Sequence, residues 1–284
     1  MLRIVTDGGV DMPESWKSEF DIDVVPMHIT FGNQSYVQGE EITLEEFYLK
    51  VDKEGIVPTT SQPSPNQLKA FYRKIAKKGD EILSIHLGSK LSGTYSVVNS
   101  VAKEMRDEIK IFPFDSGAGS AIQAFMCKEA RNLYQAGISI SGITKRLEFI
   151  REQAILIFTL DDLKFARLSG RINSIQSMLS SVLNIKPIIV LRDGLLMAGD
   201  KARTRKASIS RVIDMTRAKL QGRKANVAIV HASDIDMAQK IRTKIEGLLQ
   251  FNEIFIEELS IPTTAHMGRG AIGIVAYPAR EDGN

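Results

Sequence analysis

The sequence predicts an α/β protein of two domains, and three observations lead to that prediction. The chain has 284 residues, about twice the roughly 150 residues of an ordinary domain. Short β-branched runs alternate with segments of helical periodicity, as in a largely parallel sheet with helices on both faces. Beyond residue 154 the pattern changes toward strands joined by a tight turn, which is typical of antiparallel pairing. We therefore expect a three-layer α/β/α N-terminal domain, 1–154, with a mostly parallel sheet, and a two-layer α/β C-terminal domain, 155–284, with a mixed sheet.

The elements of the N-terminal half follow from β-branched runs and helix-start signals. Asp11 with Glu14, Thr43 with Glu46 and the run 64–67 each match the beginning of a helix, with a capping residue and an acidic or amide residue three positions later. Strands are expected at 2–5, 22–27, 82–86 and 109–114, and further helices after 94 and up to about 152.

The C-terminal half begins near 152–155, where we place the domain boundary. Asp193-Gly194 between two apolar runs predicts a hairpin. Strands are expected at 155–160, 185–191, 195–198, 227–231, 254–259 and 272–277, and helices at 163–168, at 175–183 and around 237–245. Gly268 to Gly273 has the spacing of a dinucleotide fingerprint but leads into a strand, so a tight turn is expected there.

Composition and spacing exclude several classes of protein. The net charge is 37 − 34 = +3, too weak for a protein that coats nucleic acid, and no apolar run reaches the roughly 18 residues of a membrane-spanning helix. The single cysteine, Cys127, excludes an intrachain disulfide framework, and the histidines lack metal-ligand spacing. Residues 1–7 turn polar too early for a secretory signal. We expect a cytoplasmic protein with no metal, no nucleic-acid partner and no stable insertion in a membrane.

Small hydroxyl residues gather where strands are expected to pass into helices. The segments 58–64 and 91–94 both precede a predicted helix, where backbone N–H groups and the helix dipole favour an anion. Open α/β sheets bind ligands in this crevice. For any one of these residues a role as cap or turn alone is the competing interpretation, but two such loops together indicate an anion site.

Several segments in a fixed order carry a family resemblance. They are 6–13, 58–64, 90–95, 115–117, 168–172, 186–189, 201–205 and His266 with Gly268-Arg269-Gly270. With these segments the sequence resembles the DegV family of bacterial fatty-acid-binding proteins from Thr6 to about Ala276.

The resemblance implies a lipid carrier and not a catalyst. A long-chain fatty acid such as palmitate would lie between the two domains, its carboxylate held by Thr60, Ser92 and His266. The supporting loop residues would be Ser61, Gly93 and Thr94. The resemblance also implies that the acid is presented to a fatty-acid kinase for acyl-phosphate formation. Arg171 would then face the head group or its phosphate, and Arg203 and Arg205 would lie near a partner surface. No cofactor besides the bound acid is implied.

The chain departs from the family pattern at a few positions. Gly8 stands where the family usually has serine, and Met12 where leucine is usual. Ile122 and Ala124 occupy positions where glycines are common, and Arg269 replaces a proline. The loss of a hydroxyl at Gly8 leaves the proposed carboxylate groups untouched.

Elementary energetics favour a lipid once a carboxylate is held by neutral hydroxyls. Such hydrogen bonds must offset the desolvation of the carboxylate, so most of the affinity has to come from the tail. Burying about fifteen methylenes at ~0.8 kcal/mol each gives an upper bound on the order of 10 kcal/mol. Candidate lining residues, equally suited to an ordinary core, are Phe125, Met126, Ile155, Ile157, Phe158, Phe165, Met178, Leu179, Val182 and Leu183.

Two other functions remain open from the sequence. One is a serine esterase or acyl transferase with Ser92 or Ser120 as nucleophile and His266 as base, although the nucleophile elbow and an orienting third group are missing. The other is a phosphate- or sugar-handling domain, because crevice donors and Arg171 also suit phosphate. His28, His86 and His231 are expected to be strand residues that pack without a chemical role.

Overall fold

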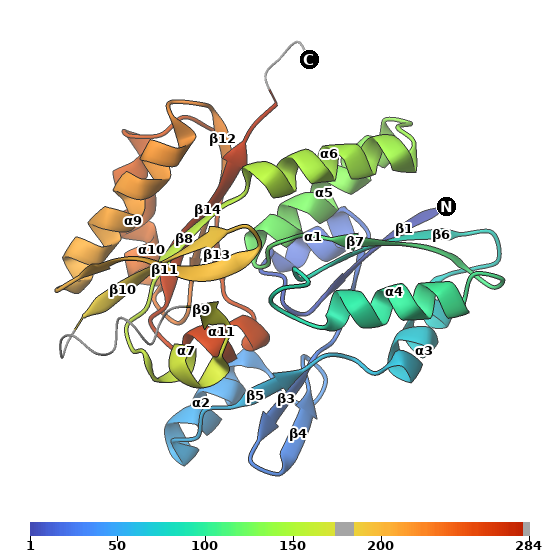
Figure 1. The fold of residues 1–284 in the computed structure, drawn as a ribbon, viewed down its shortest axis with the longest axis horizontal. Coiled ribbons are helices and arrows are strands. Elements are labelled where there is room, and N and C mark those ends of the chain that lie inside the picture. Colours follow the sequence, from blue (N-terminus) through green and yellow to red (C-terminus); the bar gives the residue numbers. More distant parts are fainter. Residues whose placement is uncertain (174–184, 281–284) are drawn as a thin grey trace. The chain divides into compact units, whose positions relative to one another are not determined.

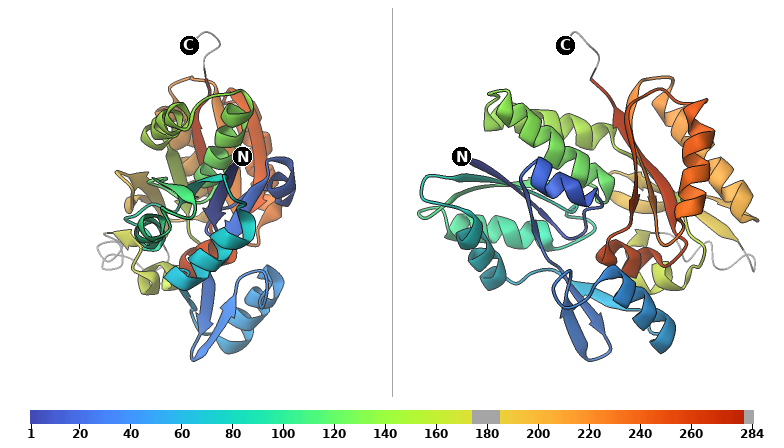
Figure 2. Two further views of the ribbon diagram at one scale, coloured as in Figure 1. Left: turned by 90° about the vertical axis from the view of Figure 1, so that its right-hand side faces the viewer. Right: turned by 180° about the vertical axis from the view of Figure 1, so that it is seen from behind.

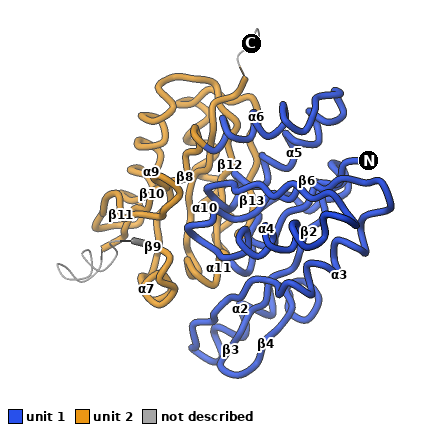
Figure 3. Tube along the Cα trace, turned by 45° about the vertical axis from the view of Figure 1, so that its right-hand side comes forward, with its two compact units in different colours: residues 1–151, 260–262 blue, residues 152–259, 263–284 orange. Residues whose placement is uncertain are grey.

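The computed structural model describes residues 1–173 and 185–280, which form two compact units. Unit 1 comprises 1–151 together with 260–262, and unit 2 comprises 152–259 together with the chain from 263 onward (Figure 3). The expected helix at 175–183 lies outside the described residues.

Unit 1 is built on a four-stranded sheet in which every neighbouring pair is parallel. Its order is β2-β1-β6-β7. The strands are β1 (Leu2–Asp7), β2 (Ile22–Val25), β6 (Glu81–His86) and β7 (Lys110–Asp115). The helices are α1 (Glu14–Glu19), α2 (Leu44–Glu54), α3 (Pro65–Ile75), α4 (Thr94–Glu104), α5 (Ala121–Gln135) and α6 (Ile140–Gln153). The largely parallel sheet expected from the alternating pattern is confirmed.

Helices cover both faces of this sheet because its strands are apolar on both faces. Val5 and Ile82 pack with side chains of α3 and α4. The next residue of β1, Thr6, accepts a hydrogen bond from Gln123 of α5 at 2.6 Å, so α5 covers the opposite face. Trp16 of α1 lies against Phe125 of α5, with ring centroids 6.2 Å apart. The unit therefore has the three layers predicted.

A second, three-stranded sheet in unit 1 was not predicted. The strands β3 (His28–Phe31), β4 (Gln34–Val37) and β5 (Thr59–Ser61) pair antiparallel in the order β4-β3-β5 (Figures 1 and 2). Phe31 of this sheet packs on Phe47 of α2 with centroids 5.8 Å apart. The prediction that 58–64 is only a loop is therefore wrong, because three of its residues pair with β3.

Helix starts in unit 1 show which local signals are reliable. Thr43 and Ser64 form complete capping boxes at the starts of α2 and α3, as predicted. The capping box expected at Asp11 is wrong, because α1 begins after Pro13 without a side-chain cap. The carboxylate of Asp11 instead accepts the backbone N–H of Ser260 at 2.7 Å, a contact with a residue 249 positions away.

Unit 2 is built on a seven-stranded mixed sheet of order β13-β12-β14-β8-β10-β11-β9. The strands are β8 (Ile155–Thr159), β9 (Ile172–Asn173), β10 (Lys186–Arg192), β11 (Leu195–Ala202), β12 (Ala225–His231), β13 (Phe251–Glu258) and β14 (Ile272–Pro278). The helices are α7 (Lys164–Ser169), α9 (Arg205–Leu220), α10 (Ile235–Glu246) and α11 (Ile261–Met267). The pairs β12·β13 and β11·β9 are parallel and the others antiparallel, which confirms the mixed sheet.

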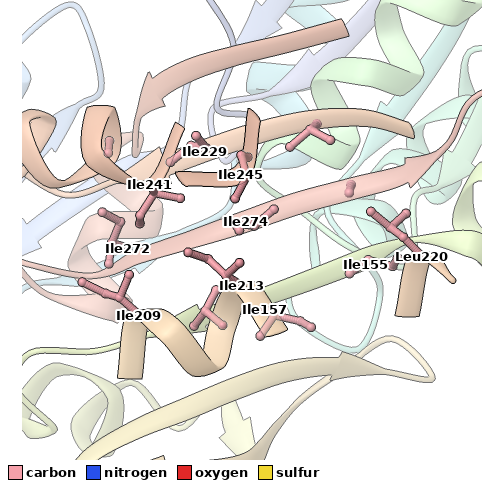
Figure 4. Close-up of a cluster of buried hydrophobic side chains, with 14 of the residues drawn as sticks. Ile155, Ile157, Ile209, Ile213, Leu220, Ile229, Ile241, Ile245, Ile272 and Ile274 are labelled. Atoms are coloured by element: carbon pink, nitrogen blue, oxygen red, sulfur yellow. The ribbon is translucent and has the colours of Figure 1, made fainter. Parts of the chain in front are cut away.

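One aliphatic cluster joins the sheet of unit 2 to helices α9 and α10. Ile155, Ile157, Ile229 and Ile274 of the strands meet side chains from both helices (Figure 4). The predicted hairpin β10–β11 turns at Asp193 and Gly194, with φ of 51° and 75°. Positive φ at both turn positions is what a two-residue hairpin requires, and it explains the Asp-Gly pair.

Candidate functional site

Ser92 lies in the loop between β6 and α4, at the carboxyl end of the parallel sheet. The backbone N–H of Ser92 donates to the carbonyl of Gly88 at 3.1 Å. The Ser92 hydroxyl shares a hydrogen bond of 2.9 Å with the hydroxyl of Thr94, and it accepts the Thr94 N–H at 3.3 Å. Thr94 is fully buried, whereas Ser92 is half-buried. The loop thus fixes a partly accessible hydroxyl beside the first turn of α4, where the helix dipole favours an anion.

Thr60 stands in the middle of β5, opposite Ile29 of β3. Its side chain is half-buried, while those of Thr59 and Ser61 are exposed. Side chains alternate along a strand, so Ser61 projects from the face opposite to that of Thr60. The two residues predicted to act together are thereby placed on different faces of the small sheet.

The segments that carry Thr60 and Ser92 meet at Gln62. A Cβ built on Gly93 would lie 2.3 Å from Oε1 of Gln62, so the amide of Gln62 rests against the backbone of Gly93. Gln62 follows β5 directly, and Gly93 precedes α4. The two hydroxyl-bearing segments singled out in the sequence are therefore neighbours within unit 1.

The position of Gly8 explains its departure from the family pattern. A Cβ built on Gly8 would lie 1.8 Å from Oε1 of Gln38. The Gln38 amide donates to the carbonyl of Gly8 at 3.0 Å. In this chain the side chain of Gln38 occupies the space that a serine at position 8 would need.

His266 lies on the short helix α11, one residue before the helix ends at Met267. Burial and the positive charge of Arg171 lower the pKa of His266 to about 4. The imidazole is therefore neutral near pH 7 and carries one N–H that can donate to an anion. Arg171 and His266, both predicted to contact the head group, are electrostatic neighbours within unit 2.

Arg171 follows α7 directly, where the helix ends at Gly170 in a left-handed conformation with φ of 66°. One terminal N–H of its guanidinium donates to the carbonyl of Ser169 at 2.6 Å, and its backbone N–H donates to the Ser169 hydroxyl at 3.3 Å. A guanidinium has five N–H donors, and one of them makes this contact with Ser169. Arg171 thus stands just after the end of α7.

Arg205, predicted to lie near a partner surface, serves its own unit. Its guanidinium donates to the carboxylate of Asp234 at 3.0 Å and to the carbonyl of Gly270. The turn through Gly268 and Gly270, each with φ of 79°, leads into β14 as predicted. Arg205 thereby ties the start of α9 to this turn, and Arg203 remains exposed.

The residues proposed to line the acyl-chain site lie in different surroundings. Ile155 and Ile157 belong to the aliphatic cluster of unit 2, and Phe125 is buried beside Trp16 in unit 1. Phe165 lies against Gly268, whose ideal Cβ would be 2.8 Å from its ring. Met178, Leu179, Val182 and Leu183 lie outside the described residues.

The alternative nucleophile Ser120 has an unusual backbone but a closed environment. Its φ of 57° and ψ of −142° place it in a strained turn between β7 and α5, as in a nucleophile elbow. The residue is 7% exposed and its hydroxyl is near the buried carboxylate of Asp11. A pKa of about 4 also makes His266 a weak base, so acyl transfer gains little from this arrangement.

Sequence reasoning missed the partners of His86. Its Nδ1 lies 2.9 Å from Asp7 Oδ2 and its Nε2 lies 2.7 Å from Ser84 Oγ, with all three side chains fully buried. The sequence did place both residues at or just beyond the ends of predicted strands. Because β1 and β6 are neighbours in the parallel sheet, Asp7 and His86 come together at its edge.

Residues 1–173 and 185–280 contain neither a metal-ligand cluster nor a membrane-spanning helix. No cluster of three or more His, Cys, Asp or Glu side chains in these ranges could hold a metal ion. No helix in the same ranges is long and apolar enough to span a membrane.

Comparison with known proteins places this geometry in context. A family model described as "Uncharacterised protein, DegV family" matches residues 1–279. Protein DegV of Bacillus subtilis is 31% identical over 275 residues, covering 96% of this chain and 98% of its own. A structure from Thermus thermophilus, described as fatty acid binding of a DegV family protein, superposes with a TM-score of 0.89 at 30% identity, covering 98% of this chain and 99% of its own. A structure described as DegV, a fatty acid binding protein from Bacillus subtilis, gives 0.87 at 30% with the same coverage.

Proposed function

Because the chain belongs to the DegV family, we propose that it binds one long-chain fatty acid and holds the carboxylate with the hydroxyls of Thr60 and Ser92 and the imidazole of His266. The observation that carries the proposal is the meeting of the two hydroxyl-bearing segments at Gln62 and Gly93. The description of the similar structures as fatty-acid-binding proteins supports the ligand class.

The chemistry of these groups suits a carboxylate. Two half-buried hydroxyls and one neutral imidazole can each donate one hydrogen bond to an ionised acid. Hydrogen bonds to a charged acceptor are each worth roughly 1.5–3 kcal/mol, which largely offsets the desolvation of the carboxylate. The affinity then depends on burial of the acyl chain.

Binding is tested first by native mass spectrometry of the protein purified from bacteria. We expect a mass excess of one fatty acid, because a buried tail leaves slowly. Gas chromatography of the extracted lipid identifies the acid. A protein that emerges without lipid and fails to bind added palmitate after delipidation would contradict the proposal.

The head-group assignment is tested with matched pairs of variants and palmitate as the probe. Ser92→Ala and Thr60→Val each remove a donor and should weaken binding by about 1–3 kcal/mol, measured by calorimetric titration of the delipidated protein. Ser89→Ala and Thr59→Val are the controls, because both side chains are exposed on the same two segments. If the controls weaken binding as much as the test variants, the assignment is wrong.

We also propose that the bound acid is presented to a fatty-acid kinase, with Arg171 facing the head group or its phosphate. The proximity of Arg171 to His266 supports this role. At pH 8, where His266 is neutral with or without Arg171, Arg171→Ala should leave palmitate affinity unchanged and lower acyl-phosphate formation by a bacterial fatty-acid kinase. Equal rates for wild type and variant would remove Arg171 from this step.

The esterase alternative is measured on the same samples. Hydrolysis of p-nitrophenyl palmitate by the wild type that disappears in Ser92→Ala or in Ser120→Ala would replace the carrier by a catalyst.

A further inference from the structure

The loop that leads from β6 to Ser92 is held by carboxylates from both neighbouring strands. In the sheet, β6 lies between β1 and β7 (Figure 1). Asp7 ends β1, and its Oδ2 accepts the N–H of Leu87 at 3.0 Å. Asp115 ends β7, and its Oδ1 accepts the N–H of Ser89 at 3.1 Å. The first residues of the loop are thus bound from two sides before the chain reaches Ser92.

Each carboxylate also closes the turn of its own strand. Oδ1 of Asp7 accepts the N–H of Gly9 at 3.0 Å, and Oδ1 of Asp115 accepts the N–H of Gly117 at 2.9 Å. Asp7 and Asp115 therefore join the loop after β6 to the loops after β1 and β7. Shifting one of these three loops would break hydrogen bonds to another.

Backbone contacts carry this constraint onward to Ser92. The N–H of Gly88 donates to the carbonyl of Ala118 at 2.7 Å, and the carbonyl of Gly88 accepts from Leu91 and Ser92 at 2.8 and 3.1 Å. A Cβ on Gly88 would lie 2.8 Å from the backbone of Gly117, so the close approach of these loops requires glycine at position 88. Ser92 is therefore only a few hydrogen bonds away from both carboxylates.

Asp7 is itself held by a buried chain of side chains. His86 Nδ1 lies 2.9 Å from Asp7, His86 Nε2 lies 2.7 Å from Ser84 Oγ, and Ser84 Oγ lies 2.9 Å from the hydroxyl of Tyr72. A neutral imidazole with its proton on Nδ1 satisfies every member, with Tyr72 donating to Ser84 and Ser84 donating to His86. Such a fully satisfied buried network fixes the position of its members.

This Asp-His-Ser arrangement resembles a catalytic triad, but Ser84 cannot act as a nucleophile. Ser84 lies within β6 and is fully buried, with its hydroxyl engaged by Tyr72. Burial alone would raise the pKa of Asp7, yet the hydrogen bonds from His86 and Leu87 outweigh it and hold the pKa below its ordinary value. Asp7 therefore stays ionised and remains a strong acceptor for the loop N–H groups.

We propose that Asp7 and Asp115 are positioning residues that hold the loop after β6 so that the Ser92 hydroxyl meets the carboxylate of a bound fatty acid. This inference rests on the proposed function. Neither residue needs to touch the ligand, because both act through the backbone of residues 87–89. Thr60 lies on β5 of the three-stranded sheet, so the hydrogen bonds from Asp7 and Asp115 do not hold it.

The test is a double-mutant cycle with palmitate and delipidated full-length protein. The Asp7 carboxylate accepts hydrogen bonds from Gly9, His86 and Leu87. Asp7→Asn places an amide NH₂ against at least one of these donors, so we expect the dissociation constant for palmitate to rise about tenfold. Asp115→Asn should raise it about two- to threefold, because water can reach this partly exposed side chain. In the Asp7→Asn background, Ser92→Ala should add less than a twofold further loss, whereas Thr60→Val should keep its full effect.

This pattern separates positioning from general destabilisation. A protein that is merely less stable but still folded would keep the contributions of both Ser92 and Thr60. Leu147→Ala removes a fully buried side chain of α6 that belongs to neither the network nor the loop, so it should lower the midpoint of urea unfolding but leave palmitate affinity unchanged.

Each outcome supports the inference or overturns it. Wild-type affinity in Asp7→Asn, or a Ser92→Ala effect of the same size in both backgrounds, would overturn it. If Asp7→Asn does not fold, as judged by circular dichroism, the same cycle in the Asp115→Asn background measures the coupling instead. If the wild type binds no palmitate, the proposed function itself fails and the inference with it, a result distinct from the loss of coupling.

Discussion

The two units bury polar groups in different ways. Among the described residues, the charged or imidazole side chains buried in unit 1 are Asp7, Asp11, His86 and Arg131, whereas unit 2 buries His231. Asp7, Asp11 and Arg131 bind backbone groups of distant segments, as Arg131 does with the carbonyls of Leu2, Phe20 and Asp21, and His86 binds the side chain of Asp7. The sheet of unit 2 packs on its helices through an aliphatic cluster.

This difference distinguishes interactions that stabilise a fold from interactions that fix the position of its loops. An aliphatic interior supplies free energy without specifying where loops lie, since the hydrophobic effect is non-directional. Buried carboxylates cost desolvation free energy and in return fix particular N–H groups. We infer that unit 1 gives up stability to fix its loops, and that unit 2 gains stability from its core.

The largest expected effect concerns the aliphatic cluster of unit 2. Ile229 is fully buried in β12, so Ile229→Ala should lower the free energy of unfolding by about 2–5 kcal/mol, measured by urea denaturation. Ile235→Ala is the control, because that side chain is 47% exposed on α10. A loss below about 1 kcal/mol at Ile229 would show that the cluster is not the main source of stability in this unit.

The carboxylate of Asp11 provides the opposite case in unit 1. Burial raises the pKa of Asp11 to about 6 despite the nearby Ser120 hydroxyl and the hydrogen bond from the Ser260 N–H. A folded-state pKa above the unfolded value of 3.8 means that stability is fully present below pH 3.8 and is lost as the pH rises toward 6. A shift of about two units corresponds to about 3 kcal/mol.

Asp11→Asn should therefore make the protein more stable than wild type above pH 6, by up to about 3 kcal/mol, and nearly equal to it below pH 4. The amide oxygen can still accept the N–H of Ser260. Urea unfolding between pH 4 and pH 8 measures the difference, with Asp214→Asn on the exposed face of α9 as the control. A variant that is less stable than wild type above pH 6 but equal to it below pH 4 would show that the charge of Asp11 stabilises the fold.

The parts of the fold that the sequence predicts correctly depend on neighbours in the chain. The capping box from Ser64 to Gln67 and the turn at Asp193 and Gly194 form within four residues, so the local residue pattern reveals them. Asp11 carries a similar local signal but binds a residue 249 positions away. A distant partner can override a local preference, and one sequence gives no sign of it.

The candidate site follows the same division. Thr60 and Ser92 could be singled out because hydroxyl residues are concentrated in their two segments. The strand β5 was not predicted, because three residues are too few to show a periodic pattern. The contact between Asp7 and His86 joins residues 79 positions apart and depends on which strands are neighbours in the sheet. Strand order is a property of the whole fold, so the hydrogen bonds of Asp7 and Asp115 to the Ser92 loop could not be predicted from the local sequence.

The smallest expected effect tests the electrostatic neighbours of unit 2. Burial lowers the pKa of His266 most and the charge of Arg171 lowers it further, so Arg171→Ala should raise that pKa. Because the folded-state pKa lies below 6.5, His266 contributes stability above pH 6.5 that is lost as the pH falls toward 4, and the variant should lose slightly less. Titration of the histidine Cε1 protons by NMR measures the shift, with His231 as internal reference and Arg167→Ala, an exposed arginine on α7, as control. An unchanged pKa of His266 in Arg171→Ala would show that burial alone lowers it, and that the charge of Arg171 does not act on the imidazole.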